Sequence, residues 1–377
     1  MNIGEVADYI TENLADPRRT SSGHFLHILG EIIVISLLAI LSGVKSFRGM
    51  EIWAIGHKQQ ISRFLKLPNG IPDADTIRRC FERLNPQLLY DVLYNSVDNI
   101  DVTGRHIAVD GKSIKGSKNE EHSAYHILTG FLTDTQMVLG QVTVPKKANE
   151  ITEAPLLFDF FNIKGSTISA DAILCQKGIT NLIASKGADF VIALKKNQPT
   201  LYDDIDLYVH NNLDKLVCKI DGPEKGHGRI ETRTYYFIPD FTSLFEISKE
   251  WPSVKSIAIV KSEVEKKGIL TTEFRYYITS LDDFEKVSKI IRKHWSIENG
   301  LHYCLDVFFD EDDCKAKKRH SPENLNIARK FALGLLHKVK ANSNPSLRLS
   351  YISLMQLCDA NIYFIQRVLK RETILKL

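Results

Sequence analysis

Three acidic side chains occupy places in the sequence where carboxylates could act on phosphate esters. Asp110 follows the apolar run IAV (107–109), Asp171 follows the run ISA (168–170), and Glu298 lies in a segment typical of a long helix. These patterns predict that both aspartates end strands of one sheet, an edge at which ligands commonly bind. Carboxylate oxygens suit hard cations, so the three acids predict a site for Mg²⁺ or Mn²⁺, with two ions expected.

Each of these acids also has a purely structural explanation. An aspartate that follows a strand is often a turn residue, and Asp110-Gly111 is a common turn pair. Most helical glutamates face solvent, so Glu298 alone does not indicate a site. A zinc site is a further alternative, because His294, Glu298 and His302 lie on one helix face at spacings of four. The two histidines are, however, about 12 Å apart along a helix axis, too far for one zinc ion to bind both easily.

The elements that must position these acids fall into successive stretches of the chain. Residues 1–100 predict a helical domain, in which the apolar run 32–44 forms a buried helix too short to span a bilayer. Residues 105–213 predict the order β-β-β-α-β-α-β-α, and so an α/β fold with a mixed sheet and helices on both faces. Residues 218–280 predict three strands with the turn EKKG, and one long helix over 282–305 then carries Glu298.

The composition is that of an ordinary globular protein with 377 residues, enough for two or three domains. The net charge of +3 excludes a histone-like polycation but allows local basic patches. The six cysteines are scattered and form no CxxC pair, which predicts reduced thiols in a cytoplasmic protein and argues against a zinc ribbon or a disulfide framework. The N-terminal segment lacks the basic start of a signal peptide, and no membrane association is expected.

Six segments, in a fixed order, resemble those of the DDE transposases of bacterial insertion sequences. The likeness is greatest to the group that includes the H-repeat-associated proteins, and it runs over about residues 15–340. The segments are IAVDGKSIKGS, LGQVTVPKKANEITEAPLLF, ISADAILCQKGI, DFVIALKKNQPTL, GHGRIETR and RKHWSIENGLHYCLDVFFDEDD. Six ordered segments together are far more specific than any one of them.

The resemblance implies a ribonuclease H-like mixed sheet flanked by helices, with an N-terminal helical domain and a β-rich insertion before the last catalytic helix. It implies Asp110, Asp171 and Glu298 as the catalytic metal ligands. Four domains or parts are expected. Residues 1–100 form an N-terminal helical domain that is a candidate for DNA binding, and residues 101–217 form the first part of the core. Residues 218–280 form the insertion, and residues 281–377 complete the core with the catalytic helix.

The activity that the resemblance implies is metal-dependent cleavage of double-stranded DNA at element ends, followed by strand transfer into target DNA. Two alternatives remain open at this point: a ribonuclease H-like nuclease without strand transfer, and a decayed transposase that only binds DNA. Because strand transfer needs two ends held together, we expect a homodimer on DNA. A bacterial cytoplasmic location, at the nucleoid when bound to DNA, is expected.

Basic side chains near these acids are candidates for DNA contact. Their structural alternatives are a solvated turn after Asp110, a charged hairpin in which Glu231 pairs with Arg229 or Arg233, and a flexible surface loop at KAKKRH (315–320). Many related transposases place an arginine before the glutamate and a lysine after it, and the nearest substitutes here are an arginine and a histidine. The candidates are Lys112, Lys115, His227, Arg229, Arg233, Arg292, His302, Lys317 and Arg319.

Overall fold

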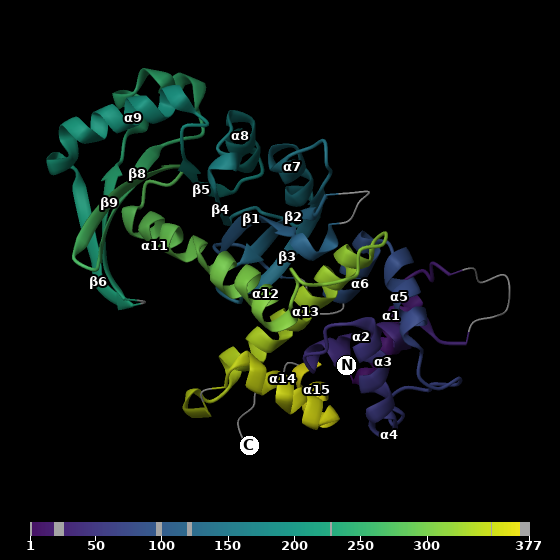
Figure 1. Cartoon of the computed structure of the whole chain (residues 1–377). Helices are drawn as coiled ribbons and strands as arrows, with labels where there is room; N and C mark the ends of the chain where they lie inside the picture. The colour runs from purple at the N-terminus through teal and green to yellow at the C-terminus, as the bar shows by residue number, and fades with distance from the viewer. Residues whose placement is uncertain are drawn as a thin grey trace.

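Helices surround one continuous sheet in the computed structural model (Figure 1). The structure describes residues 2–18, 26–95, 100–118, 123–226, 228–347 and 349–369. The nine strands lie in the order β3-β2-β1-β4-β5-β9-β8-β7-β6. Their bounds are β1 His106–Ile114, β2 Tyr125–Leu132, β3 Met137–Val144, β4 Thr167–Ala170, β5 Asp189–Leu194, β6 Val217–Gly226, β7 Arg229–Ile238, β8 Ser256–Lys266 and β9 Ile269–Thr279.

The first five strands form the mixed sheet that the sequence predicts. Strands β1, β2 and β3 are an antiparallel meander, whereas β4 pairs in parallel with β1, and β5 with β4. One apolar core joins a face of this sheet to α7 (Glu150–Phe160), α8 (Lys177–Ser185) and α9 (Pro199–Asn212). Side chains on the other face pack against C-terminal helices. The expected ribonuclease H-like sheet, flanked by helices, is confirmed.

The β-rich segment extends this sheet, because β9 pairs antiparallel with β5. It contains four strands rather than the three predicted, since β6 forms an edge strand. The sequence of β6, VCKIDGPEKG, is mostly exposed and polar, so it lacks the alternation that marks a strand. Lys267 and Gly268 have φ of 53° and 76°, the left-handed conformation that a two-residue hairpin turn requires, and the predicted EKKG turn is confirmed.

The N-terminal helices share a core with the C-terminal ones. All 13 residues of α2 are buried, as predicted for the apolar run. No helix within the described ranges is long and apolar enough to cross a membrane. The helices before the sheet are α1 Ile3–Asn13, α2 Leu29–Leu41, α3 Phe47–Gly56, α4 Lys58–Ile61, α5 Ala74–Arg83 and α6 Pro86–Asn95.

The long helix predicted over 282–305 is wrong as a single regular element. It begins after the N-cap Asp283, and its regular part α11 ends at His294. A π-helical segment, Glu298–His302, then leads directly into a further helix. The remaining helices are α10 Phe241–Leu244, α11 Phe284–His294, α12 Tyr303–Phe309, α13 Ser321–Asn342, α14 Tyr351–Ala360 and α15 Ile362–Leu369.

Candidate metal centre

The sequence predicts that Asp110 ends a strand, and this prediction is wrong: Asp110 lies in the middle of β1. It pairs with Thr129 of β2, and Gly111 pairs with Leu128. The turn explanation for Asp110-Gly111 is therefore wrong, because both residues belong to a continuous antiparallel ladder. The apolar run before Asp110 marks only the fully buried half of the strand, since β1 continues for four further residues to Ile114 with a more polar sequence.

Asp171 directly follows β4, as predicted. The last pair of the parallel ladder joins Val109 to Ala170, so the two aspartates follow neighbouring positions on neighbouring strands. The Asp171 carboxylate accepts a hydrogen bond of 3.0 Å from the amide of Ile173, which holds it against the turn that follows.

Glu298 opens the π-helical segment, in which the amide of Tyr303 donates to the Glu298 carbonyl five residues earlier. One turn later, the buried His302 brings Nδ1 to 3.4 Å from Asp110 Oδ2 and 3.6 Å from Glu298 Oε2. One ligand atom from each of Asp110, Glu298 and His302 lies within 4.8 Å of the others. The fold thus joins the middle of β1 to a helix that is 188 residues later in the chain.

Burial and neighbouring carboxylates both favour the protonated form of the two aspartates. Burial raises the pKa of Asp110, and the Glu298 and Asp171 carboxylates add to this rise. A hydrogen bond from His302 lowers the pKa of Glu298. Burial, and then the charge of Glu150, raises the pKa of Asp171. A cation among these acids would relieve the repulsion that keeps a proton on Asp110.

The donor set fits a divalent metal ion. Adjacent ligands of an octahedral ion at about 2.1 Å are roughly 3 Å apart, so the distances from His302 Nδ1 to the two carboxylates need to shorten only slightly. Two carboxylates and one imidazole are ligands that Mn²⁺ and related ions accept, while Mg²⁺ favours the oxygens. Asp171 lies outside this three-residue group, although its charge acts on Asp110.

His294 does not join the group. Its Nδ1 lies 2.7 Å from Ser169 Oγ on β4, and the same hydroxyl lies 2.7 Å from His106 Nε2 on β1. Burial lowers the pKa of His294 to about 4 and that of His106 to about 3, so both rings are neutral at pH 7. His294 therefore ties the helix before Glu298 to the sheet, and the geometry does not support a zinc ion shared by His294 and His302.

A buried lysine behind Asp110 is a feature that sequence reasoning missed. Lys330 of α13 donates from Nζ to Thr129 Oγ1 at 2.8 Å and to Gln141 Oε1 at 2.9 Å. Thr129 stands opposite Asp110 and Gln141 opposite Thr129, so the three form one polar row across β1, β2 and β3. Burial lowers the pKa of Lys330 to about 7. Its position in the otherwise apolar stretch KFALGLL (330–336) is the signal that could have indicated it.

The lysines after Asp110 are held by acids from the run DEDD (310–313) and from α12. Lys112 Nζ lies 2.7 Å from Asp306 and 3.3 Å from Asp312, and Lys115 Nζ lies 2.8 Å from Asp312. Lys112 is nearly buried and belongs to β1, so the solvated-turn explanation is wrong for this residue. A role of the two lysines in DNA contact stays a prediction.

The basic residues of the insertion form the ion pairs of a charged hairpin. Arg229 lies 3.3 Å and Arg233 2.5 Å from Glu231, which are the two pairings that the structural alternative names. Glu224 of β6 lies 2.7 Å from Arg292 and 3.0 Å from Arg233, so it links the hairpin to α11. Their contact with DNA stays a prediction.

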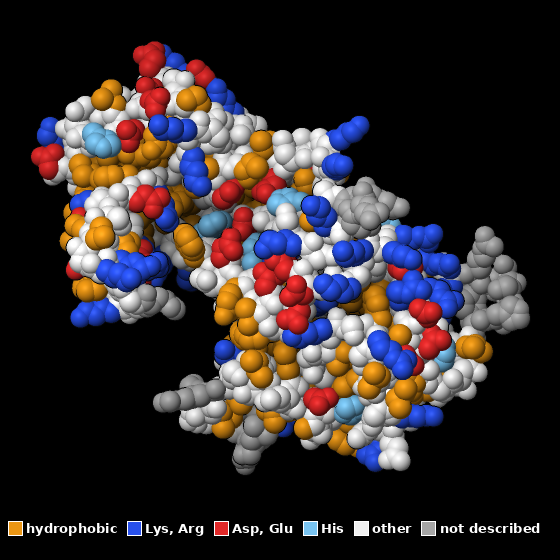
Figure 2. All heavy atoms as spheres, viewed as in Figure 1, with side chains coloured by type: hydrophobic (Ala, Val, Ile, Leu, Met, Phe, Trp, Pro, Cys, Tyr) orange, Lys and Arg blue, Asp and Glu red, His pale blue; other side chains and the backbone are white. Residues whose placement is uncertain are grey.

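Three other candidates for DNA contact remain. His227 lies outside the described residues. Lys317 and Arg319 belong to the segment that connects α12 to α13. Figure 2 shows basic side chains gathered beside a group of acidic and histidine side chains in the middle of this face.

The comparisons with known proteins cover the same elements. A family model described as "Transposase DDE domain" matches residues 101–335, and one described as "DDE_Tnp_1-associated" matches residues 10–95. The chain belongs to the family of DDE transposases. Members of this family generally use a divalent metal and act on DNA, and the three-residue group at Asp110 is a candidate metal site in this one.

Two relatives of this transposase cover most of its length. The "H repeat-associated putative transposase YhhI" of Escherichia coli (strain K12) is 33% identical over 331 residues, which is 82% of this chain and 85% of that protein. The "Putative transposase YncI" of Escherichia coli O157:H7 is 30% identical over 357 residues, or 90% of this chain and 89% of that protein. A solved synaptic complex of piggyBac transposase with hairpin DNA matches 98% of this chain and 79% of that one, at 12% identity and a TM-score of 0.46.

Proposed function

We propose that this transposase cuts DNA at the ends of its own element and joins the freed 3′-hydroxyl to target DNA, with Asp110, Asp171 and Glu298 as metal ligands. The observation that carries the proposal is the meeting of β1, β4 and the π-helical segment at one place. Asp110 and Asp171 follow neighbouring positions on paired strands, and Glu298 meets Asp110 from the π-helical segment.

Two Mg²⁺ or Mn²⁺ ions are expected, and when bound they would activate the attacking oxygen and stabilise the leaving oxygen of the phosphodiester. The protein's part is to hold the acids in place. Ile173 orients Asp171 through its amide, and the β1–β2 ladder fixes the backbone of Asp110. In cleavage the water oxygen bonds to phosphorus as the bond to the 3′-oxygen breaks. In joining, the oxygen of the freed 3′-hydroxyl loses its proton to solvent and bonds to a phosphorus of the target strand. The bond from that phosphorus to the target's own 3′-oxygen breaks, and this oxygen takes up a proton and leaves as a 3′-hydroxyl.

We also propose His302 as a ligand to one of the ions. Its Nδ1 faces both Asp110 and Glu298, and the ring is buried, so water competes little for that nitrogen. Imidazole binds Mn²⁺ more strongly than Mg²⁺. This assignment replaces the contact with DNA phosphate that the sequence suggested for His302.

The test is a cleavage and joining assay with Mg²⁺ or Mn²⁺ on DNA that carries the inverted repeats flanking the gene. Wild-type protein is expected to cut at the repeat end and to join that end to a second DNA. Asp110→Ala, Asp171→Ala and Glu298→Ala should each lower the rate by at least about a hundredfold. Wild-type rates in all three variants would sink the assignment of the acids.

The same assay separates the two alternatives. A nuclease without strand transfer would yield cut DNA but no joined product. A decayed copy would retard DNA in a gel without metal and cut nothing. A homodimer on DNA is proposed because joining needs two ends at once, and sedimentation of the protein–DNA complex would give its mass.

A further inference from the structure

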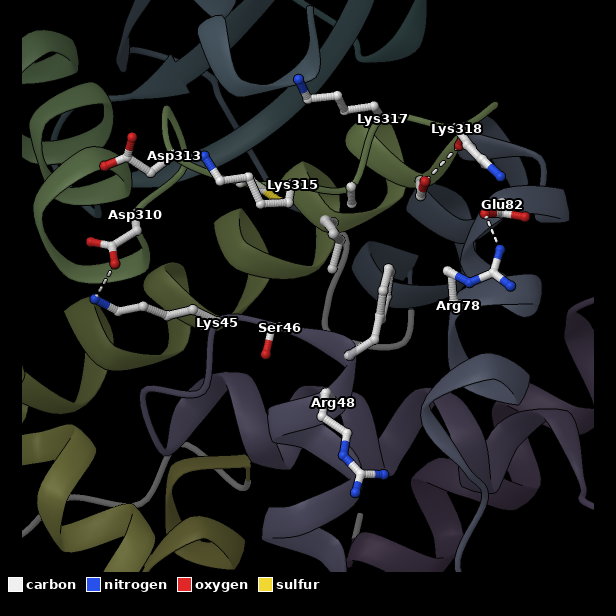
Figure 3. Close-up of a pocket in the computed structure, with 15 residues that line it drawn as sticks. Lys45, Ser46, Arg48, Arg78, Glu82, Asp310, Asp313, Lys315, Lys317 and Lys318 are labelled. Carbon is white, nitrogen blue, oxygen red and sulfur yellow. Dashed lines mark hydrogen bonds and ion pairs between the residues drawn. The ribbon is translucent and has the colours of Figure 1, made fainter. Parts of the chain in front are cut away.

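A basic cleft, whose lining includes none of the proposed metal ligands, lies between the N-terminal helices and the segment that follows α12 (Figure 3). Its volume is about 710 Å³. One wall is the start of α3 with the residues before it, the second is α5, and the third is the segment from Asp310 to Lys318 with the start of α13. No part of the proposed chemistry explains why these three walls enclose a space.

The charges of the lining are unequal. Six basic residues line the cleft against three acidic ones, and the basic ones are Lys45, Arg48, Arg78, Lys315, Lys317 and Lys318. Two of the acids are neutralised within the lining, since Lys45 lies 2.6 Å from Asp310 and Arg78 lies 2.5 Å from Glu82. Lys315 and Lys318 are exposed and form no ion pair with any residue that the structure describes. Arg48 is paired with Glu51 outside the lining, at 2.6 Å. The exposed charges of Lys315 and Lys318 still suit a polyanion.

Part of the lining is apolar. It includes Phe47, Ala316 and Leu325 beside the basic side chains. The Phe47 ring packs on Phe81, with ring centroids 5.6 Å apart, and remains partly exposed. Cations together with an aromatic ring are the combination that binds a nucleic-acid strand, whose phosphates meet the cations while sugars or bases lie on the ring.

The cleft is coupled to the metal-ligand strand. A Cβ on Gly116, just beyond β1, would come within 2.6 Å of the carbonyl oxygens of Asp312 and Cys314, so the backbone there packs directly on the wall of the cleft. Asp312 also binds Lys112 of β1. Glu298 and Asp310 are about 12 residues apart along a largely helical path, or about 18 Å. At about 3.4 Å per nucleotide, this is a distance of about five nucleotides.

We propose that this basic cleft binds the backbone of one DNA strand about five nucleotides from the bond that is cut. The proposal rests on the proposed function only for the position of that bond. Binding to the cleft itself requires neither metal nor cleavage, so it can be tested apart from the chemistry.

The experiment measures the affinity of the full chain for a duplex that contains the inverted repeat, without metal, at several salt concentrations. The test variant is Lys315→Gln with Lys318→Gln. The matched control is Lys215→Gln with Lys249→Gln, which removes the same charge from exposed lysines outside the cleft. Each lost phosphate contact lowers the slope of log affinity against log salt by about 0.9, so the test variant should lose about 1.8 and the control none.

A second arm locates the contact on the DNA. Uncharged methylphosphonate linkages placed about five nucleotides from the cut bond should weaken binding by wild-type protein and have no further effect on the test variant. Equal slopes for test and control variants, or equal losses from methylphosphonate in wild type and test variant, would overturn the proposal. If the expected differences are found but wild-type protein cuts no DNA, the cleft is a DNA-binding site and the proposed function is wrong.

Discussion

At the scale of single residues, the proposed ligand His302 should make the centre favour Mn²⁺ over Mg²⁺. Its Nδ1 lies 3.4 Å from Asp110 and 3.6 Å from Glu298, so a shared ion would bond to nitrogen as well as oxygen. We predict that Mn²⁺ bound to the wild-type protein shows ¹⁴N hyperfine coupling in pulsed EPR, and that His302→Gln abolishes this coupling. The variant should also bind Mn²⁺ roughly tenfold more weakly, as judged by an EPR titration.

The affinity for Mg²⁺ provides the internal control, because oxygen ligands dominate its coordination. It should change less than the affinity for Mn²⁺ in the same variant. A ¹⁴N signal that persists unchanged in His302→Gln would show that His302 is not a ligand.

Gly111 allows a close approach beside Asp110. A Cβ at this position would lie 2.2 Å from Glu150 Oε1 and 2.5 Å from His126 Nε2, which are themselves 2.7 Å apart. Gly111→Ala must therefore displace the ends of these two side chains and disturb their contact, and we predict a loss of about 1 kcal/mol in the free energy of unfolding, measured with urea. Gly334→Ala is the control, because a Cβ there meets nothing within 4 Å and alanine favours the α13 helix. Equal stability of the two variants would contradict this account.

The three acids proposed as metal ligands could be named from the sequence because each lies in a segment with a recognisable pattern. Asp110 and Asp171 follow buried apolar runs that are typical of strands, and Glu298 lies in an ordered family motif. The positions of His302 and Lys330 could not be derived in the same way. Both act through contacts with strands that are more than 180 residues distant in the chain, and no local pattern encodes which strand a helical side chain will meet.

The π-helical segment is the element that brings Glu298 and His302 to Asp110, and α13 supports it. His337 lies with Nε2 3.0 Å from the Gly300 carbonyl within that segment and with Nδ1 2.6 Å from the Tyr351 hydroxyl. A π-helical turn leaves the usual helical bonding pattern, so a side chain that binds one of its carbonyls stabilises it.

Burial lowers the pKa of His337 to about 4 from 6.5. In the unfolded chain this histidine takes up its proton near pH 6.5, whereas the folded protein resists protonation down to about pH 4. Above pH 6.5 the neutral ring costs no free energy of unfolding. As the pH falls from 6.5 towards 4, protonation of the unfolded chain lowers the free energy of unfolding by about 3 kcal/mol. We predict that His337→Gln reduces the pH dependence of the free energy of unfolding over this range, measured with urea at each pH. An unchanged pH dependence would exclude His337 as its source.

The predicted element boundaries are right where a continuous apolar run or a capping residue marks them, and wrong where neither is present. The apolar run in α2 and the N-cap-bounded helix α7 match the structure. The edge strand β6 escaped prediction because its side chains are mostly exposed and its ladder is interrupted near Pro223. The interruption of the helix before Glu298 also escaped, since hydrophobic periodicity does not distinguish α-helical from π-helical turns.

At the scale of the whole molecule, the continuous sheet joins the β-rich insertion to the core. Strand β9 pairs with β5 over four residues, and its inner end contributes Tyr276 and Ile278 to the same core as Phe190 and Ile192 of β5. In Figure 1 the strands run without a break from β3 to the hairpins of the insertion. A segment joined in this way cannot lose its inner strand without exposing the core beside Asp171.

We therefore predict that the insertion and the core unfold in one transition. Ile278→Ala removes a fully buried side chain from β9 and should lower the free energy of unfolding by about 2–5 kcal/mol. Ile269→Ala, at the exposed outer end of the same strand, should change it by less than about 0.5 kcal/mol. With Trp53 and Trp295 replaced by phenylalanine in every variant, fluorescence of the buried Trp251 and far-UV circular dichroism should give the same midpoint for each variant. Separate midpoints in Ile278→Ala, with the fluorescence change first, would mean that the insertion unfolds alone and that the continuous sheet does not couple it to the metal centre.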